Sequence, residues 1–468
     1  MPQIITADVT QSANYTLSTI AADDFIFIRA VVLVSNTSPN SPAYAAIGVF
    51  HDNNQIIVEG TLLGGNGLAI YSVNQNTIVT VAASGSVLGL GTIWDTMDFR
   101  AAGAQVINRG EIFGMRSAVS SLVGDAVIFN SGLISGAVNG VFGATRVENT
   151  GTIRGVTAVG MGEGADTLLN TGTLFGNVSL GGGADLFDTI GGLVNGTVFG
   201  GLGDDTYRVD STTFRIVEVV GQGSADRIES TVDFSLSGAA EVENLTLLGT
   251  ATTGAGNALD NILAGNLRGN VLGGGAGNDV IYGGEGNDTL RGAFGNDTLR
   301  GNDDDDTLNG DIGNDLLDGG ADEDRLLGGE GNDSLIGGSG DDRLFGGIGN
   351  DTLASGAGVD TLTGGQGVDV FDFNVVGDSL IGLPDLIVDH DRLTDRIDLS
   401  TIDANTLLAN NQAFTFIGTA AFTAAGQIRA VLSGSDLLLL ISNDADVLAE
   451  MQILVQGSGV LDATDFIL

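Results

Sequence analysis

Apolar residues recur at a fixed interval of nine between Gly265 and Asp372. This stretch divides without insertion into twelve consecutive nonapeptides, and the eighth position of every copy is apolar, from Leu272 to Phe371. Around Leu290, the alternation of side chains predicts a three-residue strand, residues 289–291, with the leucine facing inward. Nine residues therefore predict one half-coil of a solenoid, and eighteen residues predict a full coil with a turn on each side.

The sixth position of the same repeats is polar. It is Asn270 in the first copy and Asp in the other eleven: Asp279, Asp288, Asp297, Asp306, Asp315, Asp324, Asp333, Asp342, Asp351, Asp360 and Asp369. The glycines that precede each Asp permit positive φ, so the backbone can turn sharply and point its carbonyls inward. Each turn therefore places a carboxylate beside backbone carbonyls.

A different apolar pattern runs through the N-terminal half. The motif Gly-x-apolar-x-Gly recurs every 19 to 25 residues, for example as GEIFG at Gly110 and GLISG at Gly132. This spacing predicts coils of a parallel β-helix, with short strands between Gly and Asn turns. A β-sandwich is the alternative, but its strands would come about every 8–12 residues without a fixed motif phase. Looser copies of the Asp turn, at Asp166, Asp185 and Asp205, connect the two patterns.

These patterns predict an all-β protein, a parallel β-helix or β-roll solenoid with a C-terminal β cap. Five segments are expected: residues 1–50, an N-terminal β cap or assembly segment; residues 51–210, a parallel β-helix with coils of about 20 residues; residues 211–264, an irregular continuation; residues 265–372, the nonapeptide roll; and residues 373–468, the cap. Within the cap, DLLLLIS (Asp436–Ser442) and MQILVQG (Met451–Gly457) are expected to be buried strands. A cap is needed because a terminal coil otherwise exposes its core and an unpaired edge.

The chain is strongly acidic, with a formal net charge of -42, and all of its basic residues are Arg. Such a surface argues against nucleic acid and acidic membranes as partners, and in favour of cations. No apolar run reaches the roughly 18 residues of a membrane span. The absence of Cys excludes disulfides and Cys-ligated zinc. The first residues lack the basic and apolar stretches of a Sec signal, so we expect no Sec-dependent export.

Stacked carboxylates need a counterion. Equivalent turns would lie about 4.8 Å apart, where like charges repel by about 1 kcal/mol per pair even in water. Calcium accepts about 6–8 oxygen ligands in flexible geometry, whereas magnesium prefers octahedral, water-rich sites and zinc prefers nitrogen or sulfur. The two histidines, His51 and His390, are too few and too far from the repeats to form a zinc cluster. Multiple Ca²⁺ ions are therefore the expected cofactor.

The repeats resemble the RTX calcium-binding β-roll, whose consensus is G-G-x-G-x-D-x-U-x. The resemblance covers about a quarter of the chain and implies that the first six residues of each repeat bind calcium while the last three form the strand. It implies carboxylate ligands from the sixth-position aspartates, with Asp166, Asp185 and Asp205 as related candidates. It implies carbonyl ligands from the glycine turns, at Gly274, Gly277, Gly283, Gly286, Gly292, Gly295, Gly328, Gly331, Gly337, Gly340, Gly346 and Gly349. Arg268, Asp304 and Asp322 replace the fourth-position glycine, which predicts weaker or distorted sites there.

The region after the repeats resembles the secretion domain of serralysin-type proteins, in DRIDLSTIDAN (Asp395–Asn405) and in the final DFIL. This resemblance implies export by type 1 secretion machinery from a Gram-negative bacterium, to the extracellular space or the cell surface. Where free calcium is scarce, the carboxylate ladders should repel and keep the chain unfolded and exportable. Calcium outside the cell would bind only the folded coil and drive folding.

No catalytic motif is found, so we expect a protein that is not an enzyme. H-E-x-x-H is absent, and the glycine turns lack the Lys of a phosphate-binding loop. We expect a secreted structural protein, a homo-oligomer or polymer in a surface layer, extracellular filament or matrix. The alternative is a polysaccharide-active or polysaccharide-binding β-helix protein, of the lyase, epimerase or adhesin kind, with a surface polysaccharide as partner. Its candidate acid–base groups are Asp95, Asp98, Arg100, Arg109, Glu111 and Arg116, although such residues are more often solvated coil surface.

Overall fold

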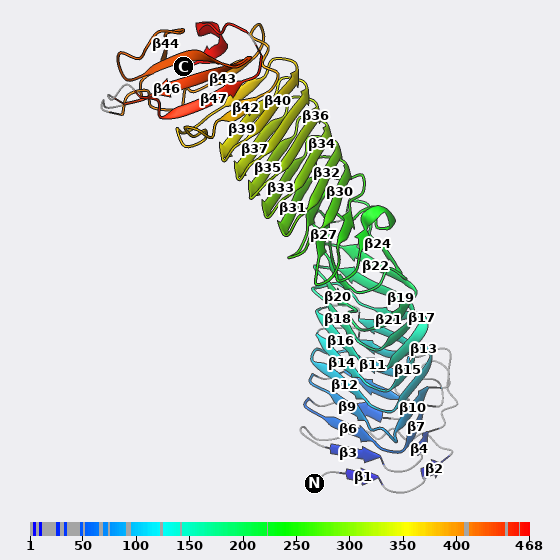
Figure 1. The fold of residues 1–468 in the computed structure, drawn as a ribbon. Coiled ribbons are helices and arrows are strands. Elements are labelled where there is room, and N and C mark those ends of the chain that lie inside the picture. Colours follow the sequence, from blue (N-terminus) through cyan, green and yellow to red (C-terminus); the bar gives the residue numbers. More distant parts are fainter. Residues whose placement is uncertain are drawn as a thin grey trace. The chain divides into compact units, whose positions relative to one another are not determined.

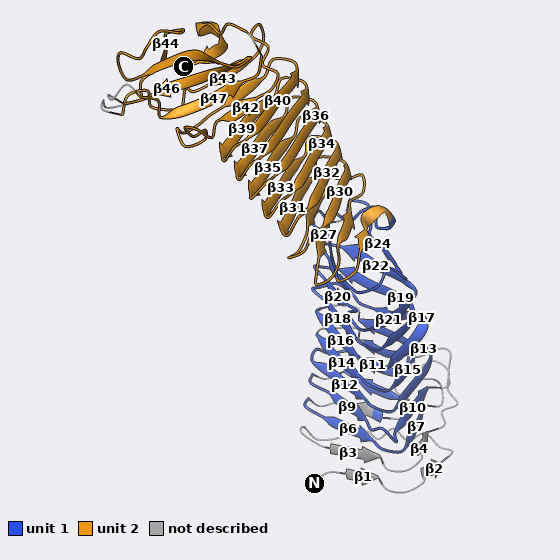
Figure 2. Cartoon of the chain, viewed as in Figure 1, with its two compact units in different colours: residues 1–230, 238–242 blue, residues 231–237, 243–468 orange. Residues whose placement is uncertain are grey.

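The computed structural model describes residues 3–5, 9–11, 25–28, 32–34, 47–49, 52–64, 69–73, 75–89, 95–121, 125–140, 143–221, 223–406, 411–444, 448–457 and 459–468. These residues form an all-β structure built mainly from parallel strands (Figure 1). The chain divides into two units (Figure 2). Unit 1 contains residues 1–230 and 238–242, and unit 2 contains residues 231–237 and 243–468.

Unit 1 is a solenoid with parallel strands on its walls. One sheet contains β1 (Gln3–Ile5), β3 (Phe25–Ile28), β6 (Gln55–Val58), β9 (Ile78–Val81), β12 (Ala104–Asn108), β14 (Ala126–Asn130), β16 (Thr145–Asn149), β18 (Thr167–Asn170), β20 (Leu186–Asp188), β23 (Thr206–Val209) and β25 (Arg227–Ser230). A second contains β2 (Val9–Gln11), β4 (Val32–Val34), β7 (Thr61–Gly64), β10 (Ser86–Gly89), β13 (Glu111–Ser121), β15 (Leu133–Gly140), β17 (Thr152–Gly160), β19 (Thr173–Gly182), β22 (Thr197–Leu202) and β24 (Arg215–Val217), with β5 (Ile47–Val49), β8 (Ile70–Ser72), β11 (Met97–Phe99) and β21 (Leu193–Asn195) paired at its side. Most of the predicted segment 1–50 lies outside the described residues.

The Gly-x-apolar-x-Gly motif forms the core of unit 1. Its central residues stack in register from coil to coil, and all are fully buried: Val87, Ile112, Ile134, Ile153 and Leu174. Burial of each such side chain contributes about 1.5–3 kcal/mol. The first glycine of the motif is needed because neighbouring coils touch there. A Cβ added at Gly132 would lie 2.2 Å from the carbonyl oxygen of Gly110.

A ladder of buried asparagines fixes one turn of unit 1. The Nδ2 of Asn108 donates to Oδ1 of Asn130 at 2.7 Å, Asn130 donates to Asn149 at 2.6 Å, and Asn149 donates to Asn170 at 2.7 Å. Each Nδ2 also donates to a nearby backbone carbonyl. Because a buried amide loses its hydrogen bonds to water, this chain of partners holds the coils in register.

Unit 2 contains the nonapeptides, which form two parallel sheets. One contains β27 (Asn244–Leu247), β29 (Ile262–Ala264), β31 (Val280–Glu285), β33 (Thr298–Asp303), β35 (Leu316–Ala321), β37 (Ser334–Ser339), β39 (Thr352–Ala357), β41 (Val370–Asp372), β43 (Arg396–Asp398) and β48 (Phe466–Ile467). The other contains β26 (Phe234–Ser235), β28 (Thr253–Ala255), β30 (Val271–Ala276), β32 (Thr289–Phe294), β34 (Thr307–Ile312), β36 (Arg325–Glu330), β38 (Arg343–Ile348), β40 (Thr361–Gln366) and β42 (Asp385–Ile387). Short 3-10 helices lie at η2 (Leu236–Gly238) and η3 (Ala463–Asp465).

The predicted coil of eighteen residues is confirmed. Leu290 of β32 pairs with Leu308 of β34, and both are fully buried. The predicted strand length is wrong, because β32 has six residues and not three. The chain turns at Ala293, which has a φ of 86°, yet Ala293 and Phe294 still pair in register with the next coil. Parallel pairing therefore continues through the first three positions of the following repeat.

The C-terminal cap is an antiparallel meander of β45 (Gln427–Ser433), β46 (Asp436–Ser442) and β47 (Met451–Val455), with β44 (Thr415–Phe416) beside β45. The two strands predicted to be buried in the cap are confirmed as β46 and β47. β47 pairs with β42, so the meander covers the edge of the last coil in that sheet. Its inward side chains, such as Leu439 and Ile453, are fully buried.

The expectation that His390 lies far from the repeats is wrong. Its ring centroid is 6.1 Å from that of Phe371, in the last nonapeptide. The reason is that β43 returns to pair with β41, which carries the intervening residues back over the end of the stack. His51, in contrast, lies outside the described residues.

Candidate calcium site

The sixth-position aspartates form two continuous ladders. Each is at most 3% exposed. In one ladder, the backbone N–H of each Asp donates to Oδ1 of the Asp eighteen residues later, at 2.7–3.0 Å, through Asp279, Asp297, Asp315, Asp333, Asp351 and Asp369. In the other, the same bond links Asp288, Asp306, Asp324, Asp342 and Asp360 at 2.7–2.8 Å. The fold thus brings the predicted carboxylates together in two rows.

One carboxylate oxygen in each of these residues has no protein partner. In all eleven aspartates Oδ2 is buried and makes no hydrogen bond. In ten of the eleven it lies over a glycine five positions earlier, and Ser355 takes that position before Asp360. A Cβ added at Gly301, for example, would be 2.1 Å from Oδ2 of Asp306 and 2.5 Å from the carbonyl oxygen of Gly319. A buried anionic oxygen without a donor is costly, so a cation is expected beside it.

The predicted carbonyl donors fall into two groups. An added Cβ at the first-position glycines would lie 2.1–2.5 Å from Oδ2 of their own Asp: Gly274, Gly283, Gly292, Gly328, Gly337 and Gly346. The fourth-position glycines have φ values between 93° and 143° and stack on the turn of the preceding coil: Gly277, Gly286, Gly295, Gly331, Gly340 and Gly349. At two departures from the consensus, Asp304 and Asp322 adopt the same left-handed backbone, with φ values of 75° and 73°.

Burial changes the acidity of these carboxyls. It raises the pKa of Asp288 to about 6, of Asp306 to about 7 and of Asp324 to about 8, and neighbouring carboxylates raise it further. The backbone N–H from the adjacent coil opposes this change but does not cancel it. Without a cation, part of each ladder is therefore protonated near neutral pH.

The residues of the ladders fit calcium. The unpartnered atoms of the ladder aspartates are carboxylate oxygens, and backbone carbonyls lie beside them. Hard cations with flexible coordination take such oxygen sets. Calcium bound between coils would supply positive charge to adjacent carboxylates and remove their repulsion.

Both ladders continue beyond the nonapeptides. Asp360 donates its N–H to Oδ1 of Asp385 at 2.9 Å, and Asp369 donates to Oδ1 of Asp395 at 3.1 Å. The sequence reading missed these two residues because insertions after residue 372 break the interval of nine. A local signal was present, since each Asp is followed two residues later by a buried isoleucine, Ile387 or Ile397.

Unit 1 contains a ladder of the same kind. Asp166 donates its N–H to Oδ1 of Asp185, Asp185 donates to Asp205, and Asp205 donates to Asp226, at 2.7–2.9 Å. Oδ2 is buried and unpartnered in Asp166, Asp185 and Asp205. Asp226 was not among the predicted residues, although Ile228 follows it in the same phase. Burial raises the pKa of Asp185 to about 8 and of Asp205 to about 7.

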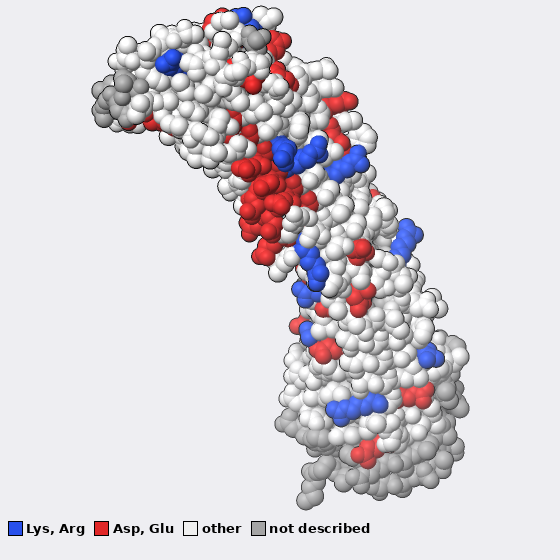
Figure 3. Space-filling view, in the orientation of Figure 1, with Lys and Arg blue, Asp and Glu red and all other residues white. Residues whose placement is uncertain are grey.

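The two sides of the nonapeptide roll differ in charge. Exposed acidic residues gather on the side of the Asp306 ladder: Asp303, Asp304, Asp305, Asp322, Glu323 and Asp341. Figure 3 shows the acidic area over the coils of unit 2. On the side of the Asp297 ladder, exposed asparagines replace most of these acids, and each Oδ1 accepts the N–H of the next at 2.7–2.8 Å: Asn278, Asn296, Asn314, Asn332 and Asn350.

The sheet on the asparagine side ends in an exposed apolar column. Phe294 pairs in register with Ile312, and the same row continues through Glu330 to Ile348. Phe294 is 60% exposed, Ile312 44% and Ile348 52%. Exposed apolar side chains in one row are typical of a contact surface.

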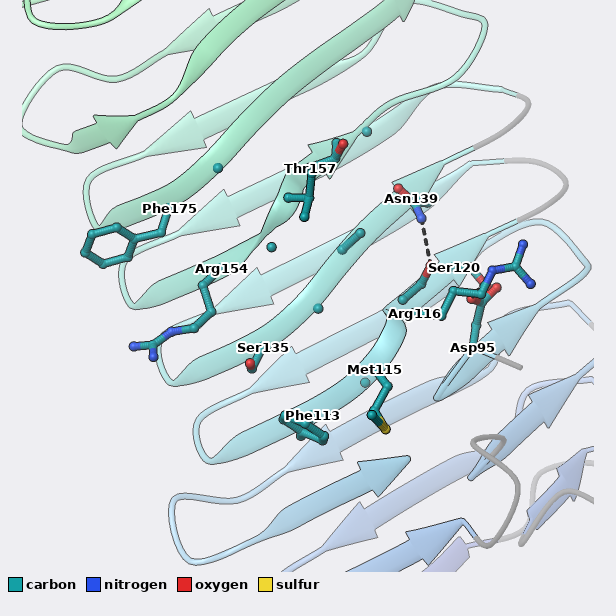
Figure 4. A pocket seen from close by; sticks show the side chains of 18 of the residues that line it. Asp95, Phe113, Met115, Arg116, Ser120, Ser135, Asn139, Arg154, Thr157 and Phe175 are labelled. Carbon is teal, nitrogen blue, oxygen red and sulfur yellow. Dashed lines mark hydrogen bonds and ion pairs between the residues drawn. The ribbon is translucent and has the colours of Figure 1, made fainter. Parts of the chain in front are cut away.

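Unit 1 carries a wide groove of about 1250 Å³ along β13, β15, β17 and β19. Asp95, Arg116, Asn139, Arg154 and Phe175 line it (Figure 4). Arg154 lies over the ring of Phe175 at 6.0 Å, and Arg116 pairs with Asp95 at 3.8 Å. Among the described lining residues, Asp95 is the only carboxylate, so the groove offers no acid–base pair. The structure does not bring the other candidates, Asp98, Arg100, Arg109 and Glu111, into this groove.

The described part of the chain has no helix with the length and apolar character of a membrane span. The chain matches no curated protein sequence. Among solved structures, it is similar to the solution structure of the AlgE6R3 subunit from the Azotobacter vinelandii mannuronan C5-epimerase. The identity is 32%, the match covers 31% of this chain and 78% of that chain, and the TM-score is 0.24.

One family description matches the part of unit 2 that holds the ladders. The RTX calcium-binding nonapeptide repeat (4 copies) matches residues 255–290, 264–299, 300–335, 318–353 and 336–371. Repeats of this kind are typical of secreted proteins. Together with the coil of eighteen residues and the buried, unpartnered carboxylate oxygens, the match identifies this chain as a calcium-binding RTX β-roll protein with multiple Ca²⁺ sites.

Proposed function

We propose that this protein is a structural β-solenoid that is exported unfolded, folds on calcium outside the cell and then self-assembles. The observation that carries the proposal is the set of unpartnered Oδ2 atoms in both ladders. Folding buries these carboxylates, so the folded state without cations must protonate them or tolerate their repulsion. Calcium that binds only the folded coil stabilises it by mass action.

Calcium-dependent folding is tested on the full-length chain. Far-UV circular dichroism is recorded with excess chelator and again with millimolar calcium, with magnesium at the same concentration as the control. We expect a gain of β signal with calcium alone. Equal spectra in chelator and calcium would overturn the proposal.

The exposed apolar column supports self-assembly with a second copy of this chain. The acidic side of the roll and the net charge of -42 oppose close approach of two chains without cations. The column lies on the opposite, asparagine-rich side, where Phe294, Ile312 and Ile348 can lose exposed apolar area on contact. Calcium lowers the repulsion and makes this contact available.

Assembly is tested by sedimentation and electron microscopy in calcium. Wild type is compared with Ile348→Ser, which breaks the apolar column, and with Ile336→Ser. Ile336 is 38% exposed in the other sheet and serves as the matched control. We expect assemblies in wild type and in the control, and smaller species in Ile348→Ser. A wild type that stays monomeric over a wide concentration range would count against assembly.

Export by type 1 secretion machinery is the route that fits a chain kept unfolded by low calcium. The test is expression in a Gram-negative host with and without a type 1 apparatus. The expected result is protein in the medium or at the cell surface only when the apparatus is present. Export through another route, or retention in both hosts, would contradict this part of the proposal.

A second candidate function is binding of an anionic polysaccharide in the groove of unit 1. It is favoured by Arg154 over Phe175, a pair that offers a positive charge and an aromatic face to a uronate ring. We propose binding without catalysis, since Asp95 already pairs with Arg116. Affinity for a uronate polymer is compared between Arg154→Gln and Arg146→Gln, an exposed arginine paired with Glu148 outside the groove. Weaker binding is expected in the first variant only, and a change in polymer length or uronate composition would instead show an enzyme.

A further inference from the structure

We propose a cation site in unit 1, held by Asp205, Glu218 and Asp226, which takes a calcium ion and joins the two sheets of the solenoid. This site lies outside the twelve consecutive nonapeptides of residues 265–372, although residues 200–208 match the same consensus. Each of the three residues offers a carboxylate oxygen, and these oxygens lie within 4.8 Å of one another. Calcium–oxygen distances are about 2.3–2.6 Å, so one ion can touch oxygens on opposite sides that are nearly 5 Å apart.

The three carboxylates are brought together from different elements. Asp205 and Asp226 immediately precede β23 and β25, which pair in register on one sheet. Glu218 follows β24 on the other sheet. All three are buried, with exposures of 0%, 8% and 2% for Asp205, Glu218 and Asp226. An ion held by them would therefore connect both sheets.

Glycine makes room for Glu218. A Cβ added at Gly200, in the neighbouring coil, would lie 2.1 Å from Oε1 and 2.4 Å from Oε2 of Glu218. Its Oε1 accepts a hydrogen bond from the hydroxyl of the fully buried Tyr207, and its Oε2 accepts one from the N–H of Gly201 at 3.1 Å. These contacts fix the carboxylate and leave both of its oxygens with further lone pairs.

Asp205 supplies an oxygen that points to a ligand. Its Oδ1 accepts the N–H of Asp185 at 2.9 Å, whereas its Oδ2 is buried and makes no hydrogen bond. The charged neighbour that acts most strongly on Glu218 is this aspartate, another anion. Backbone oxygen is also close, because a Cβ added at Gly223 would meet the carbonyl oxygen of Gly203 at 2.7 Å and Oδ2 of Asp226 at 2.8 Å. The donors are thus all oxygen, as calcium prefers.

Asp205 and Asp226 belong to the unit 1 ladder, and Glu218 adds a ligand that the ladders lack. A ladder carboxylate lies beside the glycine turns on its own side of the solenoid. Glu218, in contrast, follows β24 in the opposite sheet and accepts a hydrogen bond from Tyr207. Tyr207 occupies the eighth position of GGLGDDTYR, residues 200–208, whereas Glu218 lies outside any repeat of nine residues. Loss of this site should therefore leave the nonapeptide sites filled.

The test counts calcium ions on the full-length protein by native mass spectrometry at saturating calcium. Glu218→Gln keeps the size of the side chain and removes its charge. Glu229→Gln is the matched control, because Glu229 follows in the same coil but pairs with Arg208 at 2.8 Å. We expect Glu218→Gln to bind one ion fewer than wild type and Glu229→Gln to bind the same number. An equal count in Glu218→Gln and wild type would overturn the site.

A second measurement tests the site even if Glu218→Gln folds poorly. Terbium replaces calcium, and its luminescence is excited through nearby tyrosine. Tyr207→Phe should lower the sensitised signal while the ion count is unchanged, since the phenol ring is lost but the carboxylates remain. A terbium-soaked crystal should show an anomalous peak between Asp205, Glu218 and Asp226. Absence of that peak, with peaks present along the ladders, would reject this site and leave the calcium-dependent roll intact.

Discussion

The backbone N–H of Asp297 donates a hydrogen bond of 2.7 Å to Oδ1 of Asp315, eighteen residues further along the chain. The same contact recurs along both ladders and uses one oxygen of each carboxylate to align two coils. The second oxygen, Oδ2, remains buried without a protein partner. One side chain therefore sets the register of the coil and also offers a ligand to a cation between coils.

Removal of one ladder charge should weaken the response to calcium. Asp315→Asn retains an oxygen for the N–H of Asp297 but loses the anionic ligand. We expect the calcium midpoint of folding to rise on the order of tenfold, which corresponds to about 1.4 kcal/mol. Calcium titration followed by circular dichroism measures this change. Asp318→Asn, a partly exposed acid of the same repeat, is the control, and an equal shift in that variant would assign the effect to net charge alone.

Stability without calcium should rise as pH falls. Burial raises the pKa of Asp288 to about 6 and of Asp324 to about 8 in the folded chain, above the usual value of about 3.9 for an unfolded aspartate. From about pH 4 to about pH 8, the folded chain therefore binds more protons than the unfolded chain. The free energy of unfolding decreases as pH rises through this range. Far-UV circular dichroism in chelator should therefore show more β signal at about pH 5 than at about pH 8.

Calcium should reverse this pH dependence. Calcium needs deprotonated carboxylates, so acidification competes with binding at every ladder site. Melts at saturating calcium should therefore show a lower Tm at about pH 5 than at about pH 8. The same direction of change with and without calcium would contradict the assignment of the buried aspartates as ligands.

Glycine at residue 293 should relieve backbone strain. Ala293 has a φ of 86°, where its pairing neighbour in the previous coil is Gly275. A left-handed alanine costs about 1–2 kcal/mol relative to the right-handed region, and glycine avoids this cost. Ala293→Gly should thus be neutral or stabilising, whereas Ala276→Gly, at an ordinary backbone position, should destabilise by about 0.5–1 kcal/mol. Denaturant unfolding in calcium measures both, and equal effects would show that residue 293 is not strained.

Loss of one asparagine should weaken unit 1. Asn149 accepts from Asn130 and donates to Asn170, so Asn149→Ala removes the ladder donor of the buried Oδ1 of Asn170 and one of the acceptors of Asn130 Nδ2. A buried acceptor left without a donor costs about 1–3 kcal/mol. Asn195→Ala, at an exposed position, should be within about 0.5 kcal/mol of wild type. Similar unfolding midpoints for the two variants would mean that the ladder contributes little to stability.

Within the nonapeptides, the sequence by itself determined the coil and the spacing of its ladders. An apolar residue and an Asp kept in phase for twelve repeats leave one consistent arrangement, in which Leu290 stacks on Leu308 and Asp288 on Asp306. Such order is local and repetitive, so periodicity alone reveals it. The strands are longer than predicted because pairing continues through the second position of the next repeat, where φ is positive, as at Gly284 and Ala293.

Only the tertiary structure decided the contacts that join residues at irregular separations. Asp385 and Asp395 extend the ladders after insertions that destroy the period, and His390 returns to the end of the stack by the pairing of β43 with β41. Glu218 reaches Asp205 and Asp226 because Gly200 leaves space for its carboxylate. A repeat in the sequence predicts which residue faces inward in each coil. These contacts instead depend on how the insertions between coils fold back, and no regular spacing in the sequence predicts that path.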